Sequence, residues 1–289
     1  MPRPCSLNAT ARLRGFTIVE MLVAIGLIGV LVALIMPGIS MVRRSVWATK
    51  SQSNLRAWGG AMSSWASMNK ERVPWEGKKD AGPMAENLAN PNFWPNALPP
   101  MIGLEPYSEM CDRAFADQRI IDTWNARDAV WNDPAAVPDR DTPWTFGDAG
   151  KGGITRQFWF SYAMNIRLNQ TLLSSAGLPD FSPDCLVRLS NIPYPSRTVF
   201  MLELRATPNE LPPDDPHRIR NLDRASCSWK RFACRHQRGG HLAFIDGSVK
   251  WMTNADATTN AQGSRDPSTP QGDWNTDELI WDPLGPARH

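Results

Sequence analysis

Twenty-one residues near the N-terminus decide the fold: Phe16–Met36 reads FTIVEMLVAIGLIGVLVALIM. At about 1.5 Å per residue, a helix of this length is roughly 32 Å long, which is enough to cross the hydrocarbon core of a bilayer. Glu20 is the one charged residue in the segment. Because an acid inside a membrane helix costs about 2.5–3.5 kcal/mol, we expect Glu20 to have a function.

The residues before this segment predict its orientation. Residues 1–15 contain Arg3, Arg12 and Arg14 and no acid. Basic residues gather on the cytoplasmic side of membrane helices. The short N-terminus is therefore expected in the cytoplasm, and the rest of the chain on the other side of the membrane.

Three common N-terminal signals explain the segment less well. A secretory signal has an apolar core of about 7–15 residues followed by an A-x-A-like site, whereas this core is longer and is followed by the weak Gly38-Ile39-Ser40. A lipoprotein signal needs a cysteine directly after the apolar run, and none is there. A plain membrane anchor leaves Glu20 unexplained.

The hexapeptide from Gly15 to Glu20, GFTIVE, resembles the processing site of type IV prepilins and type II secretion pseudopilins. The resemblance implies that a prepilin peptidase cuts after Gly15 and methylates the new N-terminal residue, Phe16. It also implies that Glu20 pairs with the N-terminal amine of a neighbouring subunit during assembly, because two opposite charges in lipid are tolerable only together. Pro37 falls where such proteins often carry a helix-loosening proline.

The pattern stays helical beyond Pro37. One apolar stripe recurs at three- and four-residue spacing, formed by Leu55, Trp58, Met62 and Trp65. The helix should stop near residues 69–72, because the residue before Pro74 disfavours helical geometry. We therefore predict one helix from about Phe16 to Asn69, with its lower half in lipid and its upper half packed on a globular head.

The composition favours a loop-rich head over a helical bundle, since the chain has 25 Pro, 20 Gly and 13 Trp. Tryptophan at this frequency can fill a core or line a sugar-binding face, and the core is the favoured interpretation. The formal net charge of +2 gives no electrostatic case for nucleic acid as a partner.

Residues 74–156 show no sustained hydrophobic period, and we interpret them as loops and turns over the head. Short helices are expected within residues 87–98 and 112–132. The Asp-rich stretch Asp133–Asp148 could bind calcium through loop oxygens. Its spacing matches no EF-hand, so solvated loop acids are the favoured interpretation.

The chain becomes β-rich from Gln157. Gln157–Met164 and Thr198–Leu204 are predicted strands, because they are rich in aromatic and β-branched residues. Asp246-Gly247 lies between two apolar runs and predicts a hairpin with a type I′ turn, which needs positive φ at both central residues.

A second resemblance lies in the same region. His236, nine further residues and then Asp246-Gly247 resemble the H-X9-DG motif of a large group of prepilin-type proteins. Residues 161–165, 195–198 and 281–283 also have counterparts in that group. Glu203 departs from the pattern, since the corresponding strand of the group often ends in Asp. The two resemblances cover about residues 12–50 and 157–285.

Three residues are weak candidates for a metal site: His236, Asp246 and Glu203, with His241, Cys227 and Cys234 near them in sequence. The chain has no C-x-x-C and no H-x-x-x-H, and a hydrolase would need a nucleophile beside its base. A structural role is favoured, in which Asp246 forms the turn and His236 hydrogen-bonds backbone or Glu203. No catalytic residue and no cofactor are predicted.

The cysteines predict disulfides without deciding their pairing. Cys5 lies in the leader, and four remain in a domain expected to face an oxidising compartment: Cys111, Cys185, Cys227 and Cys234. Four cysteines allow three connectivities. One hypothesis pairs Cys227 with Cys234 across a short loop, and Cys111 with Cys185.

The predicted architecture is α+β and pilin-like, with a long N-terminal transmembrane helix packed on an antiparallel sheet. The predicted parts are a leader at 1–15, a membrane and assembly helix at 16–36, its continuation at 37–72 and a periplasmic head at 73–289, with a loop-rich insertion at 74–156 and the H-X9-DG region at 157–285.

The predicted function is structural and not enzymatic: a subunit of a type II secretion pseudopilus or a type IV pilus-like filament. The expected partners are a prepilin peptidase, other pilin or pseudopilin subunits and the bacterial inner membrane. The alternative is a membrane-tethered binding module whose Trp-rich head recognises a polysaccharide or a secreted protein. An exposed planar row of Trp would favour that alternative, and burial of nearly all of them would favour the structural subunit.

Overall fold

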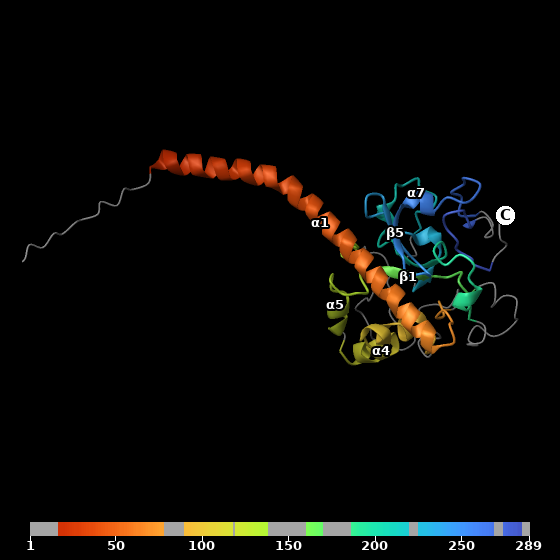
Figure 1. Cartoon of the computed structure of the whole chain (residues 1–289). Helices are drawn as coiled ribbons and strands as arrows, with labels where there is room; N and C mark the ends of the chain where they lie inside the picture. Colours follow the sequence, from red (N-terminus) through yellow and green to blue (C-terminus); the bar gives the residue numbers. More distant parts are fainter. Residues whose placement is uncertain are drawn as a thin grey trace, which may run out of the picture. The chain divides into compact units, whose positions relative to one another are not determined.

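The computed structural model describes residues 17–77, 90–117, 119–137, 160–169, 186–219, 225–268 and 274–284. The chain divides into two compact units, residues 1–45 and 46–289 (Figure 1). Helix α1, Ile18–Met68, runs through the boundary between them and is 51 residues long. The predicted N-terminal helix is confirmed.

In the first unit, the described chain is the apolar part of α1. Every side chain from Thr17 to Ser45 is exposed. Pro37 lies inside the helix and does not end it, and Ser40 Oγ donates a hydrogen bond of 2.8 Å to the Pro37 carbonyl. Within the described part of the chain, α1 is the helix that is long and apolar enough to cross a membrane.

In the second unit, the remainder of α1 buries one face. The predicted stripe is confirmed, because Leu55, Trp58, Met62 and Trp65 are all buried. The helix ends where Lys70 and Glu71 both adopt positive φ, of 58° and 60°. Such left-handed residues close many helix C-termini.

The head is built on a five-stranded sheet of order β3-β1-β2-β4-β5. The strands are β1 Tyr162–Asn165, β2 Val199–Glu203, β3 Ser226–Cys227, β4 Gly239–Phe244 and β5 Val249–Thr253. All neighbouring pairs are antiparallel except β1 and β3, which are parallel. The predicted strands are present, although β1 starts at Tyr162 and residues 157–159 lie outside the described chain.

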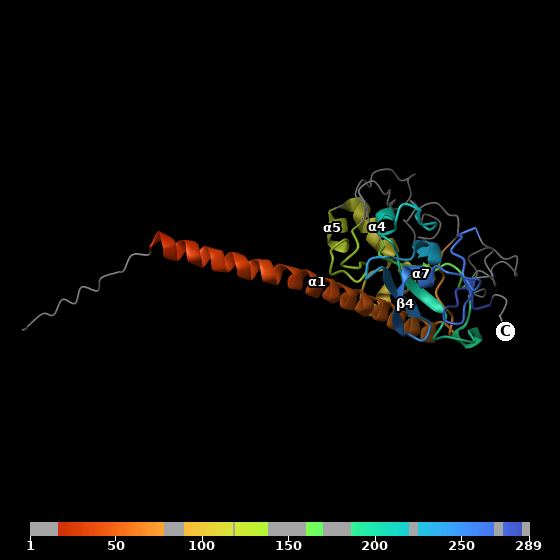
Figure 2. The same ribbon diagram turned by 90° about the horizontal axis from the view of Figure 1, so that it is seen from above.

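The two faces of the sheet belong to two apolar clusters. On β1, Tyr162 and Met164 join the cluster that contains Leu55 and Trp58 of α1, whereas Ala163 joins a second cluster with Trp229, Trp274 and Trp281. This follows from the alternation of side chains along a strand. Helix α1 therefore covers one face of the sheet and the C-terminal loops cover the other (Figure 2).

Short helices fill the remaining described segments: α3 Trp94–Ala97, η1 Pro99–Ile102, α4 Tyr107–Ala116, α5 Ile120–Trp124, η4 Leu189–Asn191, η5 Pro208–Glu210, η6 Trp229–Arg231 and α7 Asn254–Ala257. Helices α3 and α5 fall within the two predicted ranges. Helix α4 begins five residues before residue 112, where the second predicted range starts.

Burial of tryptophan favours the core interpretation. Eleven of the 13 Trp are described, since Trp144 and Trp159 lie outside the described residues, and eight of those eleven are buried. Trp58, Trp94 and Trp131 pack on one another with ring centroids 4.9–6.0 Å apart. Among the described Trp, Trp251 is the most exposed, at 43%.

The hairpin of β4 and β5 is confirmed, but the predicted turn type is wrong. Gly247 has a φ of 82°, whereas Asp246 is not among the residues with positive φ. The Gly247 amide donates to the Phe244 carbonyl (2.9 Å), and the Phe244 amide donates to the Ser248 carbonyl (2.9 Å). One left-handed glycine after a turn is the pattern of a three-residue hairpin loop with a bulge, in which the aspartate needs no positive φ.

Candidate functional site

The N-terminal motif is described only from its third residue. Gly15 and Phe16, the predicted processing residues, lie outside the described residues. Glu20 lies in the first turn of α1, where its Oε2 accepts hydrogen bonds from the Thr17 amide (2.9 Å) and hydroxyl (2.8 Å). The Glu20 amide in turn donates to Thr17 Oγ1 (3.2 Å). Thr17 and Glu20 thus form a capping box, a local role that the resemblance did not imply.

A second site lies inside the head, around the carboxylate of Glu203 at the end of β2. Glu203 is fully buried. Its Oε1 accepts a hydrogen bond of 2.5 Å from Ser51 Oγ on α1 and lies 2.7 Å from His241 Nδ1 on β4. The Tyr162 hydroxyl on β1 lies 2.9 Å from Ser51 Oγ. Glu203 therefore joins the helix to three neighbouring strands.

His236 completes the group from the segment before β4, but with a different partner from the one expected. Its Nε2 lies 3.0 Å from Asp133 Oδ2 and 3.7 Å from Glu203 Oε1. The interpretation of Asp133 as a solvated loop acid is wrong, because its side chain is 0% exposed. The rest of that Asp-rich stretch, residues 138–148, lies outside the described residues.

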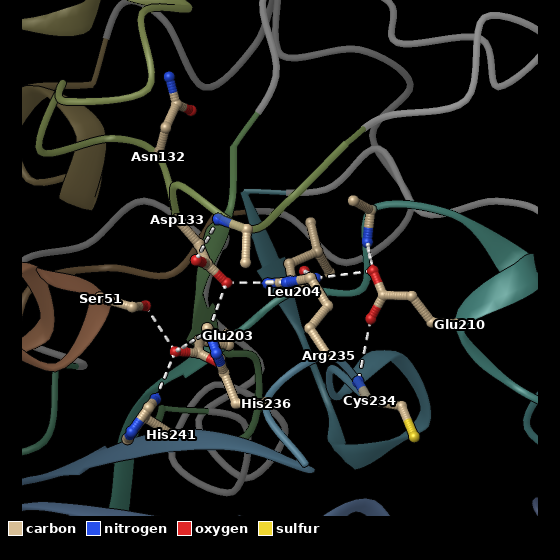
Figure 3. Close-up of polar contacts among 12 residues, drawn as sticks. Ser51, Asn132, Asp133, Glu203, Leu204, Glu210, Cys234, Arg235, His236 and His241 are labelled. Carbon is tan, nitrogen blue, oxygen red and sulfur yellow. Dashed lines mark hydrogen bonds and ion pairs between the residues drawn. The ribbon is translucent and has the colours of Figure 1, made fainter. Parts of the chain in front are cut away.

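Arg235 holds the carboxylates around His236 in place (Figure 3). Its Nε is 2.8 Å from Asp133 Oδ2, and its Nη1 is 2.8 Å from Glu210 Oε1 and donates to the Leu204 carbonyl. The second oxygen of Glu210 accepts from the Cys234 amide (2.9 Å). These buried ion pairs connect η5, the end of β2 and the loop after α5.

The charges of this network depend on one another. Burial by itself would raise the pKa of the Asp133 carboxyl, but the Arg235 guanidinium and the hydrogen bond with His236 hold that pKa well below its usual range. Burial would lower the pKa of the His236 imidazole, but the hydrogen bond with Asp133 and the charge of Glu203 raise it above its ordinary value. Burial also opposes the charge of Arg235, whose pKa is raised by Glu210 and Asp133.

Local backbone geometry explains how His236 reaches the network. Gln237 and Arg238 have φ values of 54° and 65°, and the His236 and Gly239 backbones donate to each other at 3.1 and 3.2 Å. Positive φ at both central residues is the property of a type I′ turn. The type I′ turn that was predicted at Asp246-Gly247 therefore lies nine residues earlier, at Gln237-Arg238, directly after His236.

His236 and Asp246, at the two ends of the H-X9-DG segment, contact different residues. Asp246 is exposed, and its Oδ1 accepts from the Ser248 amide (2.9 Å). Gly247 approaches α1, since a Cβ on Gly59 would lie 3.4 Å from the Gly247 Cα. The described residues whose donor atoms converge are Glu203, His236 and His241, so Asp246 is not part of that group.

No disulfide joins the three cysteines in the described part of the chain, Cys111, Cys227 and Cys234. The hypothetical bridge between Cys227 and Cys234 is therefore absent from the structure. Cys185 lies outside the described residues, and its pairing with Cys111 stays a prediction. Burial raises the pKa of the Cys111 thiol to about 12.

Comparison with known proteins identifies the N-terminal segment. Residues 11–36 match the prokaryotic N-terminal methylation motif. No curated protein matched the chain, and no solved structure did. Proteins with this motif are prepilin-like and generally structural, and the motif implies processing by a prepilin peptidase. Together with the apolar part of α1, it indicates a membrane-anchored, pilin-like protein.

Proposed function

We propose that the chain is a structural subunit of a periplasmic or surface filament, either a type II secretion pseudopilus or a type IV pilus-like fibre. After cleavage at Gly15 and methylation of Phe16, the subunit leaves the inner membrane and stacks through its apolar helix on other subunits. The observation that carries the proposal is the methylation motif at residues 11–36, directly joined to an apolar helix with one acid.

Glu20 is the residue on which assembly depends in this proposal. A carboxylate in an apolar bundle is costly unless an opposite charge meets it. The new amine of Phe16 on a neighbouring subunit supplies that charge. Both hydrogen bonds from Thr17 go to Oε2 of Glu20. The capping box needs only a hydrogen-bond acceptor at this side chain, whereas the intersubunit pair needs its negative charge.

The burial of tryptophan supports the structural subunit over the polysaccharide-binding alternative. A sugar-binding face needs several exposed aromatic rings, and among the described residues the large exposed aromatic rings are few: Phe115, Tyr194 and Trp251. Their segments are α4, the loop before β2 and β5, which are separate elements.

Two substitutions separate the capping role of Glu20 from the assembly role. Glu20→Gln keeps a side chain that can cap the helix but removes the charge. It should be cleaved normally and be lost from sheared filament fractions. Thr17→Val removes the capping hydroxyl and keeps the acid, so it should be cleaved and incorporated. Filaments that contain Glu20→Gln at the wild-type level would rule out the proposed charge pair.

A further inference from the structure

Three nitrogen and oxygen donors converge in the head from separate segments: Glu203, His236 and His241. Their donor atoms all lie within 4.8 Å of one another, and all three residues are buried (Figure 3). Glu203 Oε1 is 2.7 Å from His241 Nδ1 and 3.7 Å from His236 Nε2. A tetrahedral Zn²⁺ with bonds of about 2.0–2.2 Å separates its ligand atoms by about 3.4 Å. Small side-chain adjustments would bring both distances to this value.

The formal charges around the donors leave room for a divalent cation. Asp133 and Glu210 pair with the guanidinium of Arg235, and the buried carboxylate of Glu203 lies 3.7 Å from His236 Nε2. With both imidazoles neutral, as metal ligands must be, the three carboxylates and one guanidinium leave an excess of two negative charges. Buried charges are costly unless they are balanced, and one divalent cation between the two imidazoles would balance both.

The buried carboxylate of Glu203 is incompletely hydrogen-bonded. Its Oε2 is buried and has no hydrogen-bond partner among the described residues. This oxygen faces Gly240, where a Cβ would lie only 2.8 Å from it. A side chain at position 240 would therefore crowd the carboxylate, and the glycine keeps the space beside it clear.

The surroundings of the donors resemble the outer shell of a metal site. Ser51 Oγ orients Glu203 through its hydrogen bond of 2.5 Å. Asp133 Oδ2 lies 3.0 Å from His236 Nε2, and Arg235 holds that carboxylate in place. Hydrogen bonds such as the one from Ser51 to Glu203 hold ligating carboxylates in position in many metal sites.

The geometry points to a buried site for Zn²⁺, with Glu203 Oε1, His236 Nε2 and His241 Nδ1 as ligands. Two imidazoles with carboxylate oxygens are a donor set that suits zinc. Three protein ligands and one water molecule would complete a tetrahedral coordination sphere. The cation would tie β2 and β4 to the segment of His236, and through Ser51 to α1. This inference does not depend on filament assembly.

The test is zinc binding by the full-length protein in detergent. The protein is stripped with a chelator, dialysed against Zn²⁺, freed of excess metal and analysed for metal per chain. We expect one zinc per folded chain and a higher Tm after reloading. His236→Gln and His241→Gln should each lower the zinc affinity at least tenfold. His217→Gln, which removes a buried imidazole outside the group, should keep one zinc.

Cobalt gives an independent measurement if the variants do not fold. Co²⁺ in the wild-type protein should give the visible absorption of a tetrahedral site with nitrogen and oxygen ligands. A folded wild-type chain that binds less than a tenth of an equivalent of zinc would overturn the inference. So would equal losses in His217→Gln and His236→Gln, or a thiolate charge-transfer band, which would assign the metal to cysteine.

Discussion

The two parts of helix α1 differ in which of their side chains are buried. From Ile18 to Met36, apolar residues surround the helix apart from Glu20, and all side chains as far as Ser45 are exposed in the structure. From Val46 to Met68, the buried side chains occupy one face that meets the sheet, and polar residues occupy the other. A 3.6-residue stripe is needed only where one face meets water. The comparison teaches that the first part is suited to lipid or to other helices, and the second to a protein core.

The largest expected effect comes from removing a buried tryptophan of α1. Trp58→Ala should lower the free energy of unfolding of the head by about 3–5 kcal/mol, because it removes a fully buried indole from the core. Leu31→Ala removes an apolar side chain from the exposed part of α1 and should leave that free energy unchanged. Denaturant unfolding of the detergent-solubilised chain measures both. Equal losses of unfolding free energy in the two variants would contradict the division of α1 into an exposed part and a buried part.

Acid should also destabilise the packed part of the molecule. His217 is fully buried, and its ring contacts that of Trp274. Burial lowers the pKa of its imidazole to about 4. The positive charges of Arg265 and Arg205 also lower this pKa, whereas the charge of Asp215 raises it. The unfolded chain, with an ordinary pKa near 6.5, binds the proton more tightly. Stability from this group is therefore complete above about pH 6.5 and is lost as pH falls through 4, by up to about 3 kcal/mol.

The comparison of wild type with His217→Gln isolates that contribution. Glutamine does not titrate, so the variant should lose about 3 kcal/mol less than wild type between pH 7 and pH 4. Unfolding curves collected at several pH values give the two slopes. Parallel slopes would show that His217 is not the group responsible.

A single hydroxyl on α1 should have a measurable effect on the packed face. Ser51 is buried, and it donates to the Glu203 carboxylate, so Ser51→Ala should cost about 2 kcal/mol, as expected for a hydrogen bond to a charged group. Ser53 is exposed two residues later, and Ser53→Ala should change stability by less than about 0.5 kcal/mol. Thermal unfolding of both variants checks the difference.

The smallest expected effect distinguishes two adjacent glycines on α1. Gly60 is exposed, and a Cβ there would meet no atom within 4 Å. Gly60→Ala should stabilise the head by about 0.5–1 kcal/mol through helix propensity. A Cβ on Gly59 would lie 3.4 Å from the Gly247 Cα, so Gly59→Ala should gain less. The same gain at both positions would contradict the close approach of the hairpin turn to α1.

The sequence predicted the elements of the fold that depend on the local pattern of residue types. The N-terminal helix follows from a continuous apolar run, its stripe from Leu55 to Trp65 from the spacing of apolar residues, and the strand at Thr198–Leu204 from its aromatic and β-branched content. The hairpin at Asp246-Gly247 was also predictable, although its turn type was not. Several types of hairpin turn place a glycine in the left-handed region, so the Asp-Gly dipeptide alone does not identify the turn type.

The buried network could not be predicted in the same way. Asp133 and His236 are 103 residues apart in the sequence, and nothing around Asp133 marks it as buried rather than solvated. His241 was noted only as near the candidate residues in sequence, and its contact with Glu203 depends on the pairing of β2 with β4. Arg235 adjoins His236 in the motif, and this proximity is the one local signal that could have indicated the ion pairs.

Processing by prepilin peptidase after Gly15 is tested most directly by the mass of the N-terminal peptide of the chain. The protein is extracted from membranes of cells that possess the peptidase, digested and analysed. We expect a peptide that starts at Phe16 and carries one N-methyl group. A peptide that still contains residues 1–15 joined to Phe16 would contradict it.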